Sequence, residues 1–400
     1  MRFLIVDDVY QSFLHSFYTR YPGYGQLSYQ EAWGTLMDEG IALADSYSRN
    51  LKKLGHEAEE VMLHDERLQK RWAAENGVSI SKKGDSRNRV RYTLRNMGRR
   101  WLVATGTVGS RVYNVLKIPF RKLLGGTATE PWVYEILAAQ IEQARPDVLL
   151  NHGLRELDEI FLQRVRPFVK LIVGQHASPL PPNVPYGSYD LMLSSLPNLV
   201  DHFRRQGVKS EYFRLGFEPS VLDRLGQIQS LYSVSFVGGY SPDHRRGYEL
   251  FEQVANEVPV DFWGYGADIL SQDSPILRRY HGEAWGMDMY RVLAQSRVAL
   301  NRHIAIAESY ANNMRLYEAT GVGTLLITDM KDNLNDLFEV GKEVVAYHDA
   351  QECVELVKYY LEHENERSAI AKAGQQRTLR EHTYYHRMQE LVEIVKRYLP

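Results

Sequence analysis

Polar side chains with acid–base chemistry follow several short apolar runs in this chain of 400 residues. Three pairs lie close behind such runs in the first half: Asp7 and Asp8, Asn151 and His152, and Gln175 and His176. Because ligands of parallel α/β sheets bind beyond the carboxyl ends of the strands, we expect these pairs to line one cleft. A carboxylate or an imidazole there can accept the proton of a hydroxyl group, so Asp7, Asp8 and His176 are candidates for a general base. The simpler interpretation is that they are ordinary loop residues.

A pair of glycines ends another apolar run in the second half. Gly238 and Gly239 follow residues 233–237, and a helix is expected to begin near Arg245 and Arg246. Glycine lets the backbone approach a ligand closely, and the amides at a helix amino terminus, with arginines beside them, suit a diphosphate. A tight turn that binds nothing is the alternative interpretation.

The segment 311–326 carries an arginine and a glutamate three positions apart. Asn312 or Asn313 is a natural N-cap and Gly321 a natural stop, so a short helix should lie between them. Arg315 and Glu318 then share one helix face. The cation can contact a phosphate, and the carboxylate can accept hydrogen bonds from both hydroxyls of a ribose. The alternative is a surface ion pair worth about 0.3 kcal/mol, and the residues alone do not decide between the two.

Composition and motifs exclude several classes of protein. The 48 Lys and Arg nearly balance the 50 Asp and Glu, giving a net charge of −2, so we expect no nucleic-acid partner. Neither G-x-G-x-x-G nor G-x-x-x-x-G-K-[ST] occurs at a strand-to-helix turn, which argues against a nicotinamide enzyme and a P-loop NTPase. The single cysteine, Cys353, can form neither an internal disulfide nor a cysteine metal cluster, so we expect a cytoplasmic protein. We also expect no metal site, because no metal-ligating pair of acids ends a strand of the second half. The first apolar run ends at Asp7 and is too short for a secretory signal or a membrane span.

The residues named above are spaced along a regular alternation of strands and helices. Strand-like apolar runs recur at residues 3–6, 58–63, 148–150, 171–173, 191–193, 233–237, 260–263, 298–301, 324–328 and 343–346. Helical periodicity lies between them, including one stretch from Ser28 to Leu54. Repeated units of this length predict an α/β protein with two doubly wound, Rossmann-like parallel-sheet domains that face a central cleft.

Length and composition also suggest where the domains divide. We place an N-terminal domain at residues 1–218 and a C-terminal domain at 219–383, with a hinge at 216–219 and in the polar stretch 226–230. The last helix, within residues 384–400, carries an apolar stripe that could pack back on the N-terminal domain.

Residues 82–122 interrupt the alternation with a strongly basic segment. Twelve Lys and Arg face one acid, Asp85, so the segment has a net charge of +11. Apolar residues are interleaved with these cations. This pattern is typical of an amphipathic insertion that lies on an anionic membrane surface, here the inner face of the membrane. The alternative is a solvated helical pair that covers the sheet. If the segment is a membrane tether, a variant in which several arginines between Arg87 and Arg100 are neutralised should bind anionic vesicles more weakly than the wild type. Equal binding by the variant would reject the tether.

Several motifs of the second half together resemble a known family. They are Phe236-Val237-Gly238-Gly239, Asn301-Arg302-His303, the run from Asn313 to Ala319, the run from Gly341 to Val345, the run from Ala369 to Gly374, and Glu381-His382-Thr383-Tyr384. In these motifs the chain resembles the spore-maturation-protein CgeB-type glycosyltransferases, which belong to the two-domain GT-B superfamily. The first half resembles that family more loosely, through its strand and helix pattern and residues 174–179.

The resemblance implies a glycosyltransferase that needs no metal ion. Its C-terminal domain would hold a UDP, GDP or dTDP sugar, its N-terminal domain would hold an acceptor, and the sugar would be transferred in the cleft. The donor-binding residues carried over are Gly238, Gly239, Arg245, Arg246, Tyr265, Asn301, His303, Asn313, Arg315 and Glu318. Glu318 matches the glutamate that holds the donor ribose, and the two glycines match the loop beside the diphosphate. The expected role is glycosylation of a surface polysaccharide, a glycolipid or a protein.

One departure from the pattern leaves the stereochemistry open. Many retaining members carry two glutamates eight positions apart, but the residue eight before Glu318 is Tyr310, and Glu308 lies ten before. If the enzyme inverts, it needs a general base. If it retains, the leaving phosphate can take the proton. A sugar-binding protein of the same fold without catalysis is the alternative, and release of nucleotide from a nucleotide sugar would distinguish the two.

Overall fold

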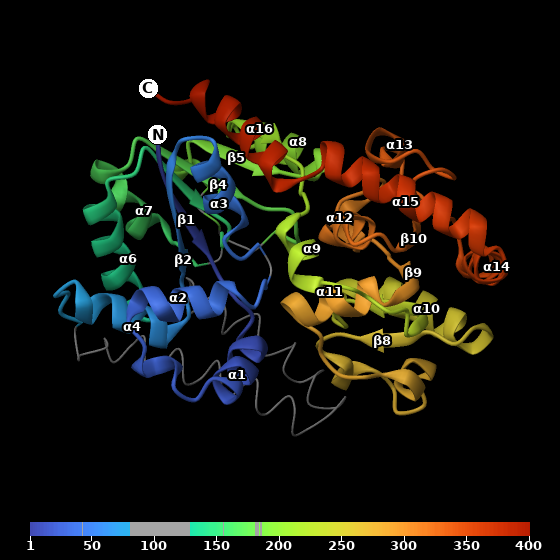
Figure 1. Cartoon of the computed structure of the whole chain (residues 1–400). Coiled ribbons are helices and arrows are strands. Elements are labelled where there is room, and N and C mark those ends of the chain that lie inside the picture. The colour runs from blue at the N-terminus through green and yellow to red at the C-terminus, as the bar shows by residue number, and fades with distance from the viewer. Residues whose placement is uncertain (42, 81–128, 155, 181–183, 185) are drawn as a thin grey trace, which may run out of the picture.

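A computed structural model describes residues 1–41, 43–80, 129–154, 156–180, 184 and 186–400, so the basic segment 82–122 lies outside the described residues. Two parallel sheets dominate this part of the chain (Figure 1). The first has six strands in the order β2-β1-β3-β4-β5-β6. Their bounds are β1 Arg2–Asp7, β2 Glu57–Met62, β3 Val148–Asn151, β4 Leu171–Gln175, β5 Leu191–Ser194 and β6 Ser210–Tyr212.

The second sheet has five described strands in the order β11-β10-β9-β7-β8. Its strands are β7 Tyr232–Val237, β8 Asp261–Trp263, β9 Ser296–Leu300, β10 Leu325–Asp329 and β11 Val345–Tyr347. Every paired register in both sheets is parallel. The predicted architecture of two parallel-sheet α/β domains is therefore confirmed.

Helices pack on both faces of each sheet, because the strands are apolar on both sides. In β1, Leu4 and Val6 join one buried cluster with helices α6 to α8, whereas Phe3 and Ile5 join another with α3 and α16. The helices of the first half are α1 Gln11–Arg20, α2 Tyr29–Met37, α3 Ser46–Lys53, α4 Glu66–Glu75, α6 Pro131–Ala144, α7 Glu159–Val165 and α8 Pro197–Arg205. Those of the second half are α9 Ser220–Leu225, α10 Arg245–Glu257, α11 Gly286–Ala294, α12 Met314–Gly321, α13 Leu334–Leu337, α14 Ala350–Glu362, α15 Glu364–Glu381 and α16 Tyr384–Lys396.

One sequence-based prediction of an element was wrong, and one short strand was missed. The helix expected from Ser28 to Leu54 is two helices, α2 and α3, because Gly40 and Ala44 between them adopt the left-handed region, with φ of 65° and 44°. The short strand β6 was not predicted, since its three residues contain only one that is buried. It nevertheless pairs with β5 at the edge of the first sheet.

The last helix, α16, covers a face of the first sheet. Met388, Leu391 and Val395 are buried in one cluster with Phe3 and Ile5 of β1. Figure 1 shows α16, drawn in red, reaching from the second half of the molecule to the first. At its start, the chain runs beside Phe217, whose amide donates to His382 O at 2.8 Å and whose carbonyl accepts from Tyr384 N at 2.9 Å. The two segments that connect the halves of the molecule, one at Phe217 and one at residues 382–384, thus lie side by side.

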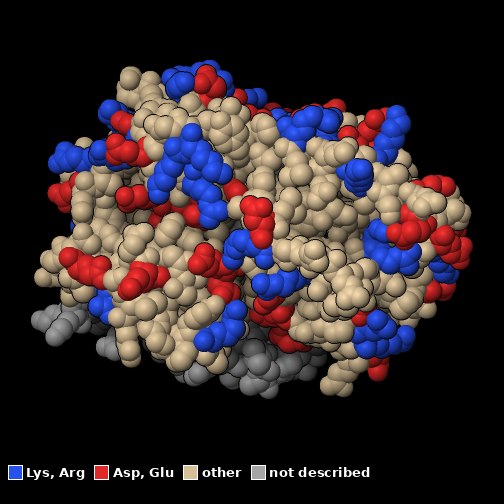
Figure 2. Space-filling model, viewed as in Figure 1, with Lys and Arg blue, Asp and Glu red and all other residues tan. Residues whose placement is uncertain are grey.

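Charges of both signs are interspersed over the visible face of the molecule (Figure 2), in keeping with the balanced composition. No helix within the described ranges is long and apolar enough to span a membrane.

A buried carboxyl group sits between β2 and α3. Glu60 is 3% exposed and accepts a hydrogen bond from Ser48 N at 2.8 Å. Burial raises the pKa of Glu60 to about 8, against the hydrogen bonds from Ser48. Because the folded protein then binds a proton that the unfolded chain releases near pH 4.5, this group lowers stability as the pH rises from about 4.5 to about 8.

Replacing Glu60 by glutamine should remove that pH dependence. Each pKa unit corresponds to about 1.4 kcal/mol, so we expect Glu60→Gln to raise the free energy of unfolding by about 2 to 4 kcal/mol at pH 9 and by little at pH 4.5. Urea unfolding of the variant and the wild type at pH 9 and pH 4.5 measures this change in the free energy of unfolding. Glu59→Gln, at an exposed position on the same strand, is the matched control. An equal gain at both pH values would contradict the assignment.

Candidate functional site

Each sheet has one point at which the strand order reverses. In the first sheet β1 lies between β2 and β3, and in the second β7 lies between β8 and β9. In doubly wound sheets the crevice at the carboxyl ends of these central strands is the place where ligands bind. The residues that follow β1, β3, β7 and β9 are therefore the first to consider.

Helix α12 brings an arginine and a glutamate to the carboxyl end of β7. Arg315 Nη2 donates to Val237 O, the last carbonyl of β7, at 3.0 Å. Arg315 Nη1 lies 2.8 Å from Glu318 Oε2, and both side chains are largely buried. Burial raises the pKa of Glu318, against the charge of Arg315. Both Nε and Nη1 of Arg315 are buried; in the described structure Nε has no hydrogen-bond partner and Nη1 has the ion pair with Glu318.

Two asparagines hold the start of α12 against the second sheet. Asn313 caps the helix by accepting from Leu316 N at 3.2 Å, and its amide donates to Asn301 Oδ1 at 2.7 Å. Asn301 follows β9 and donates to Thr328 of β10 at 2.9 Å. Of the two asparagines that the sequence offered as an N-cap, Asn312 and Asn313, the second caps the helix. The left-handed residue after α12 is Gly323 and not Gly321, which instead lacks a side chain because a Cβ would overlap the Phe217 ring.

The paired glycines lie directly beside this helix in space. Gly238 N donates to Trp263 O at 3.1 Å, which extends the pairing of β7 with β8. A Cβ on Gly239 would overlap the ring of Tyr265, and a Cβ on Gly264 would overlap Gly238 O. Close packing therefore requires glycine at these positions. Burial raises the pKa of the Tyr265 hydroxyl, which keeps this ring neutral.

The two arginines expected near the diphosphate begin helix α10. Arg245 and Arg246 form the first turn of α10, after the short turn Pro242–His244. Both are exposed, and Arg245 pairs with Glu249 at 2.7 Å, one helical turn away. None of their described contacts reaches the glycine pair. Arg315, in contrast, contacts Val237, the residue just before the glycine pair.

His303 is held by a partner that the sequence analysis did not connect with it. Asp329, at the end of β10, accepts from His303 N at 2.9 Å and lies 2.7 Å from its Nδ1. Burial acts to raise the pKa of Asp329, but the hydrogen bonds of His303 and the charge of Lys331 outweigh it and lower this pKa. The His303 ring is fully buried, so in this structure it supports the ends of β9 and β10.

At the first sheet, carboxylates and imidazoles gather at the ends of β1, β2 and β3. Asp8 lies 2.7 Å from Nδ1 of His64, which follows β2, and Asp7 Oδ2 lies 3.4 Å from Nδ1 of His152, which follows β3. His64 was missed by the sequence analysis, although the rule of polar residues at strand ends would have found it. His176 lies apart from these contacts, 9% exposed, with its Nε2 near Ser178 Oγ at 3.1 Å.

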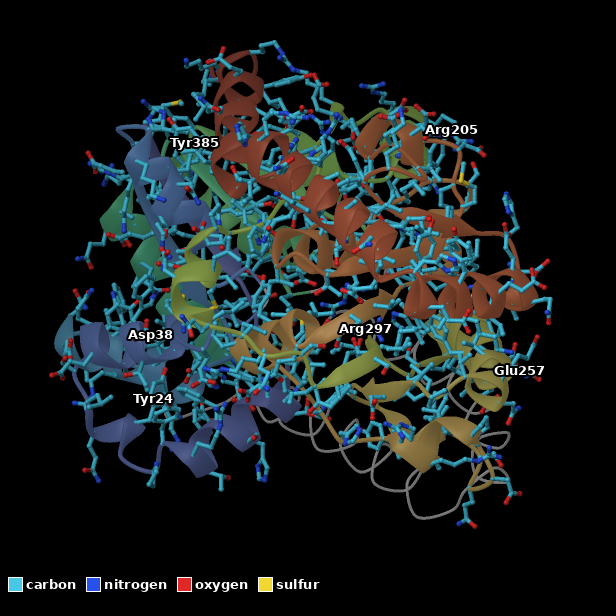
Figure 3. The ribbon with its side chains drawn as sticks, turned by 45° about the vertical axis from the view of Figure 1, so that its right-hand side comes forward. Tyr24, Asp38, Arg205, Glu257, Arg297 and Tyr385 are labelled. Carbon is cyan, nitrogen blue, oxygen red and sulfur yellow. The ribbon has the colours of Figure 1, made fainter. Side chains whose placement is uncertain are left out.

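Aromatic rings join the two halves next to these groups. Tyr10, two residues after Asp8, lies 5.2 Å from the ring centroid of Tyr265 and 4.9 Å from that of Trp285. Tyr265 and Trp285 stack at 5.4 Å with an interplanar angle of 12°. Nearby, Met287 N donates to Glu39 O at 2.8 Å, and Arg224 reaches the carbonyl of Asp38, a residue labelled in Figure 3. The carboxyl end of β1 is therefore close to the glycine pair.

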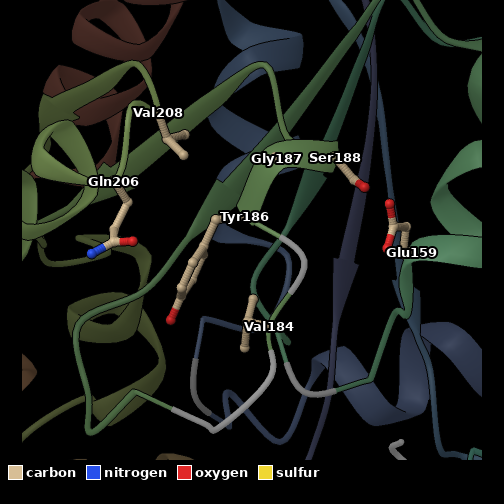
Figure 4. Close-up of a pocket in the computed structure, with 7 residues that line it drawn as sticks. All are labelled: Glu159, Val184, Tyr186, Gly187, Ser188, Gln206 and Val208. Carbon is tan, nitrogen blue, oxygen red and sulfur yellow. The ribbon is translucent and has the colours of Figure 1, made fainter.

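A separate cavity of about 330 Å³ lies outside this site. Figure 4 shows its lining, formed by Glu159, Val184, Tyr186, Gly187, Ser188, Gln206 and Val208. Residues 186–188 precede β5, and Gln206 and Val208 precede β6, so the cavity is at the amino ends of these strands. Because ligands of such sheets bind at the carboxyl ends, we do not assign the chemistry to it. The described residues contain no group of three or more His, Cys, Asp or Glu side chains arranged to hold a metal ion.

Comparisons with known proteins agree with this geometry. Residues 245–393 match the family model described as glycosyl transferase-like. No curated protein matched the sequence. HepE from Anabaena, solved with UDP and glucose, superposes with a TM-score of 0.56 at 13% identity, over 99% of this chain and 100% of that one. A glycosyltransferase from Rickettsia africae gives a TM-score of 0.56 at 8% identity, over 100% and 98% of the two chains.

A third similar structure matches over a smaller part of the chain. Sucrose-phosphate synthase from Thermosynechococcus elongatus gives a TM-score of 0.50 at 12% identity, over 67% of this chain and 77% of that one. At these identities the structural matches establish the fold. The whole chain therefore shares the fold of HepE and of the Rickettsia africae glycosyltransferase, and residues 245–393 are similar to the glycosyl transferase-like family.

Proposed function

We propose that this protein transfers a sugar from a nucleoside diphosphate to an acceptor hydroxyl, with the donor held by Arg315, Glu318 and the glycine pair. The observation that carries the proposal is the contact of Arg315 with Val237 O, since it joins the start of α12 to the residue before Gly238. A cation, the amides at a helix amino terminus and a glycine backbone near that contact are the groups that suit a diphosphate, which supports the proposal.

These groups can stabilise the charge that develops during transfer. When the bond between the sugar and the diphosphate breaks, negative charge grows on the leaving phosphate. Arg315 and the first amides of α12 supply positive potential there, so the proposal requires no metal ion. Glu318, which pairs with Arg315 in this structure, would exchange that partner for the ribose hydroxyls when the donor binds.

UDP is the first nucleotide to test, because HepE has been solved with UDP-glucose and with UDP. We further propose that the chain is of the CgeB type and that its acceptor lies against the first sheet, near Asp7, Asp8 and His176. The sequence motifs support the first statement. The position of these residues at the carboxyl ends of β1 and β4 supports the second.

A nucleoside diphosphate should raise the melting temperature of the protein. A ligand that binds only the folded state adds about 2.7 kcal/mol at a concentration 100 times its Kd. Differential scanning fluorimetry with UDP, GDP, dTDP and ADP measures the effect, and uridine, which has no phosphate, is the control. If none of the four diphosphates shifts the melting temperature, the donor site is wrong.

A further inference from the structure

A histidine and an aspartate at the carboxyl end of the first sheet form an accessible couple. Asp8 Oδ1 accepts from Val9 N at 2.9 Å and from His64 N at 3.3 Å, and these two amides fix the carboxylate. Its Oδ2 lies 2.7 Å from Nδ1 of His64. The His64 side chain is 23% exposed and that of Asp8 is 33% exposed, so both can be reached from solvent.

The Asp8 carboxylate determines which nitrogen of the His64 ring is left to accept a proton. An ionised carboxylate accepts hydrogen bonds, so the proton of a neutral His64 ring sits on Nδ1 and the lone pair is left on Nε2. An imidazole oriented in this way by a carboxylate is the arrangement that general bases use. Nε2 faces Glu156, whose Oε2 lies 3.6 Å away, beyond hydrogen-bond distance.

A chain of contacts connects the couple to the proposed donor site. Tyr10 follows Asp8 by two residues, and its ring contacts that of Tyr265 at 5.2 Å. The Tyr265 ring in turn packs on the backbone of Gly239. The rings of Tyr10 and Tyr265 therefore link the loop of Asp8 to the glycine pair.

We propose that His64, positioned by Asp8, is the base that deprotonates the acceptor, so that the sugar is transferred with inversion. This inference rests on the proposed function above. Nε2 takes the proton of the acceptor hydroxyl as its oxygen forms a bond to the anomeric carbon. The bond from that carbon to the diphosphate oxygen breaks on the opposite face, and the nucleoside diphosphate leaves with the electron pair.

The surroundings of His64 predict the pH range in which the base works. Burial acts to lower the pKa of His64, but the hydrogen bond and charge of Asp8, with the charges of Glu156 and Glu130, outweigh it and raise this pKa. These carboxylates come from the loop after β1, the loop after β3 and the start of α6. Activity should therefore fall on the acid side of a pKa above the usual value for histidine, because the protonated ring accepts no proton.

Hydrolysis of UDP-glucose, with water as the acceptor, tests the assignment. We expect His64→Gln to lower kcat by about 100-fold or more and to leave the KM for UDP-glucose and the affinity for UDP unchanged. The acid limb of the pH–rate profile should vanish in His64→Gln and move to lower pH in Asp8→Asn. The matched control is His348→Gln, which removes an exposed histidine 2.8 Å from Glu352 at the edge strand β11. In the wild type, proton NMR should detect β-glucose first, since the donor is the α-linked sugar.

Three results would overturn the proposal. They are α-glucose as the first product, a His64→Gln rate equal to that of His348→Gln, and a wild type that binds UDP but releases no glucose from UDP-, GDP- or dTDP-glucose. Failure of all nucleotides to bind would instead overturn the donor site. The two failures are therefore distinguishable.

Discussion

Replacing Glu318 by alanine should weaken nucleoside diphosphate binding by about 1 to 3 kcal/mol, or roughly 5-fold to 150-fold in Kd, through loss of hydrogen bonds to a charged acceptor. Glu318 is 4% exposed and carries the partner charge of Arg315, so the variant also leaves a buried cation unpaired. We expect its free energy of unfolding to fall by about 3 to 5 kcal/mol. Isothermal titration with UDP measures the affinity, and urea unfolding measures the stability.

The two effects can be separated with related variants. Glu318→Gln keeps the shape and one acceptor oxygen, so it should bind UDP more weakly than the wild type but more tightly than Glu318→Ala. Asp288→Ala removes an exposed partner of Arg291 at the same i, i+3 spacing on α11 and should change neither quantity by more than about 0.5 kcal/mol. An unchanged affinity for UDP in Glu318→Ala would show that the carboxylate does not contact the donor.

Replacing Gly264 by alanine should have the largest effect on stability of any single substitution considered. Gly264 has φ of 148°, which L side chains rarely adopt, and its Cβ would overlap the carbonyl oxygen of Gly238. Backbone cannot move away as a flexible side chain can, so the strand pair β7–β8 must separate at its end. We expect a loss of more than about 4 kcal/mol, and a loss of UDP binding in any protein that still folds.

A second glycine gives the matched control for that result. Gly341 has φ of 84°, and nothing lies within 4 Å of its Cβ position. Gly341→Ala should therefore cost only the backbone strain, about 1 to 2 kcal/mol, and should bind UDP normally. Urea unfolding and titration of the two variants compare them. If both variants lose the same free energy of unfolding, the overlap of the Gly264 Cβ with Gly238 O does not destabilise the protein.

The sequence predicted most of the strands because their apolar runs are short, buried and bounded by polar residues or glycine. It predicted the start of α12 to within one residue, from Asn312 or Asn313, since capping depends on residues only three positions apart. It failed between Ser28 and Leu54, where the apolar spacing continues through a turn that backbone conformation alone reveals. It also failed at β6, a strand stabilised mainly by pairing with β5.

For the site, too, the sequence indicated contacts between residues close in the chain but not contacts between distant ones. The pair Arg315 and Glu318 was visible as an i, i+3 spacing, but its contact with Val237 joins residues 78 positions apart. Arg245 was expected at the diphosphate because it follows the glycines in sequence, yet it pairs with Glu249 on its own helix. The contacts of His64 and Asp329 were not visible in the sequence, because their partners Asp8 and His303 lie 56 and 26 positions away.

By itself, therefore, the sequence determined the α/β class, the two sheets and most of the residues at their carboxyl ends, since these depend on periodicity and on short-range capping. Only the tertiary structure decided which of those residues meet. That depends on the strand order, which makes β1 and β7 central, and on the packing of Tyr10 against Tyr265, which brings the two carboxyl edges together. Such contacts join segments more than 200 positions apart and leave no periodic trace in the chain.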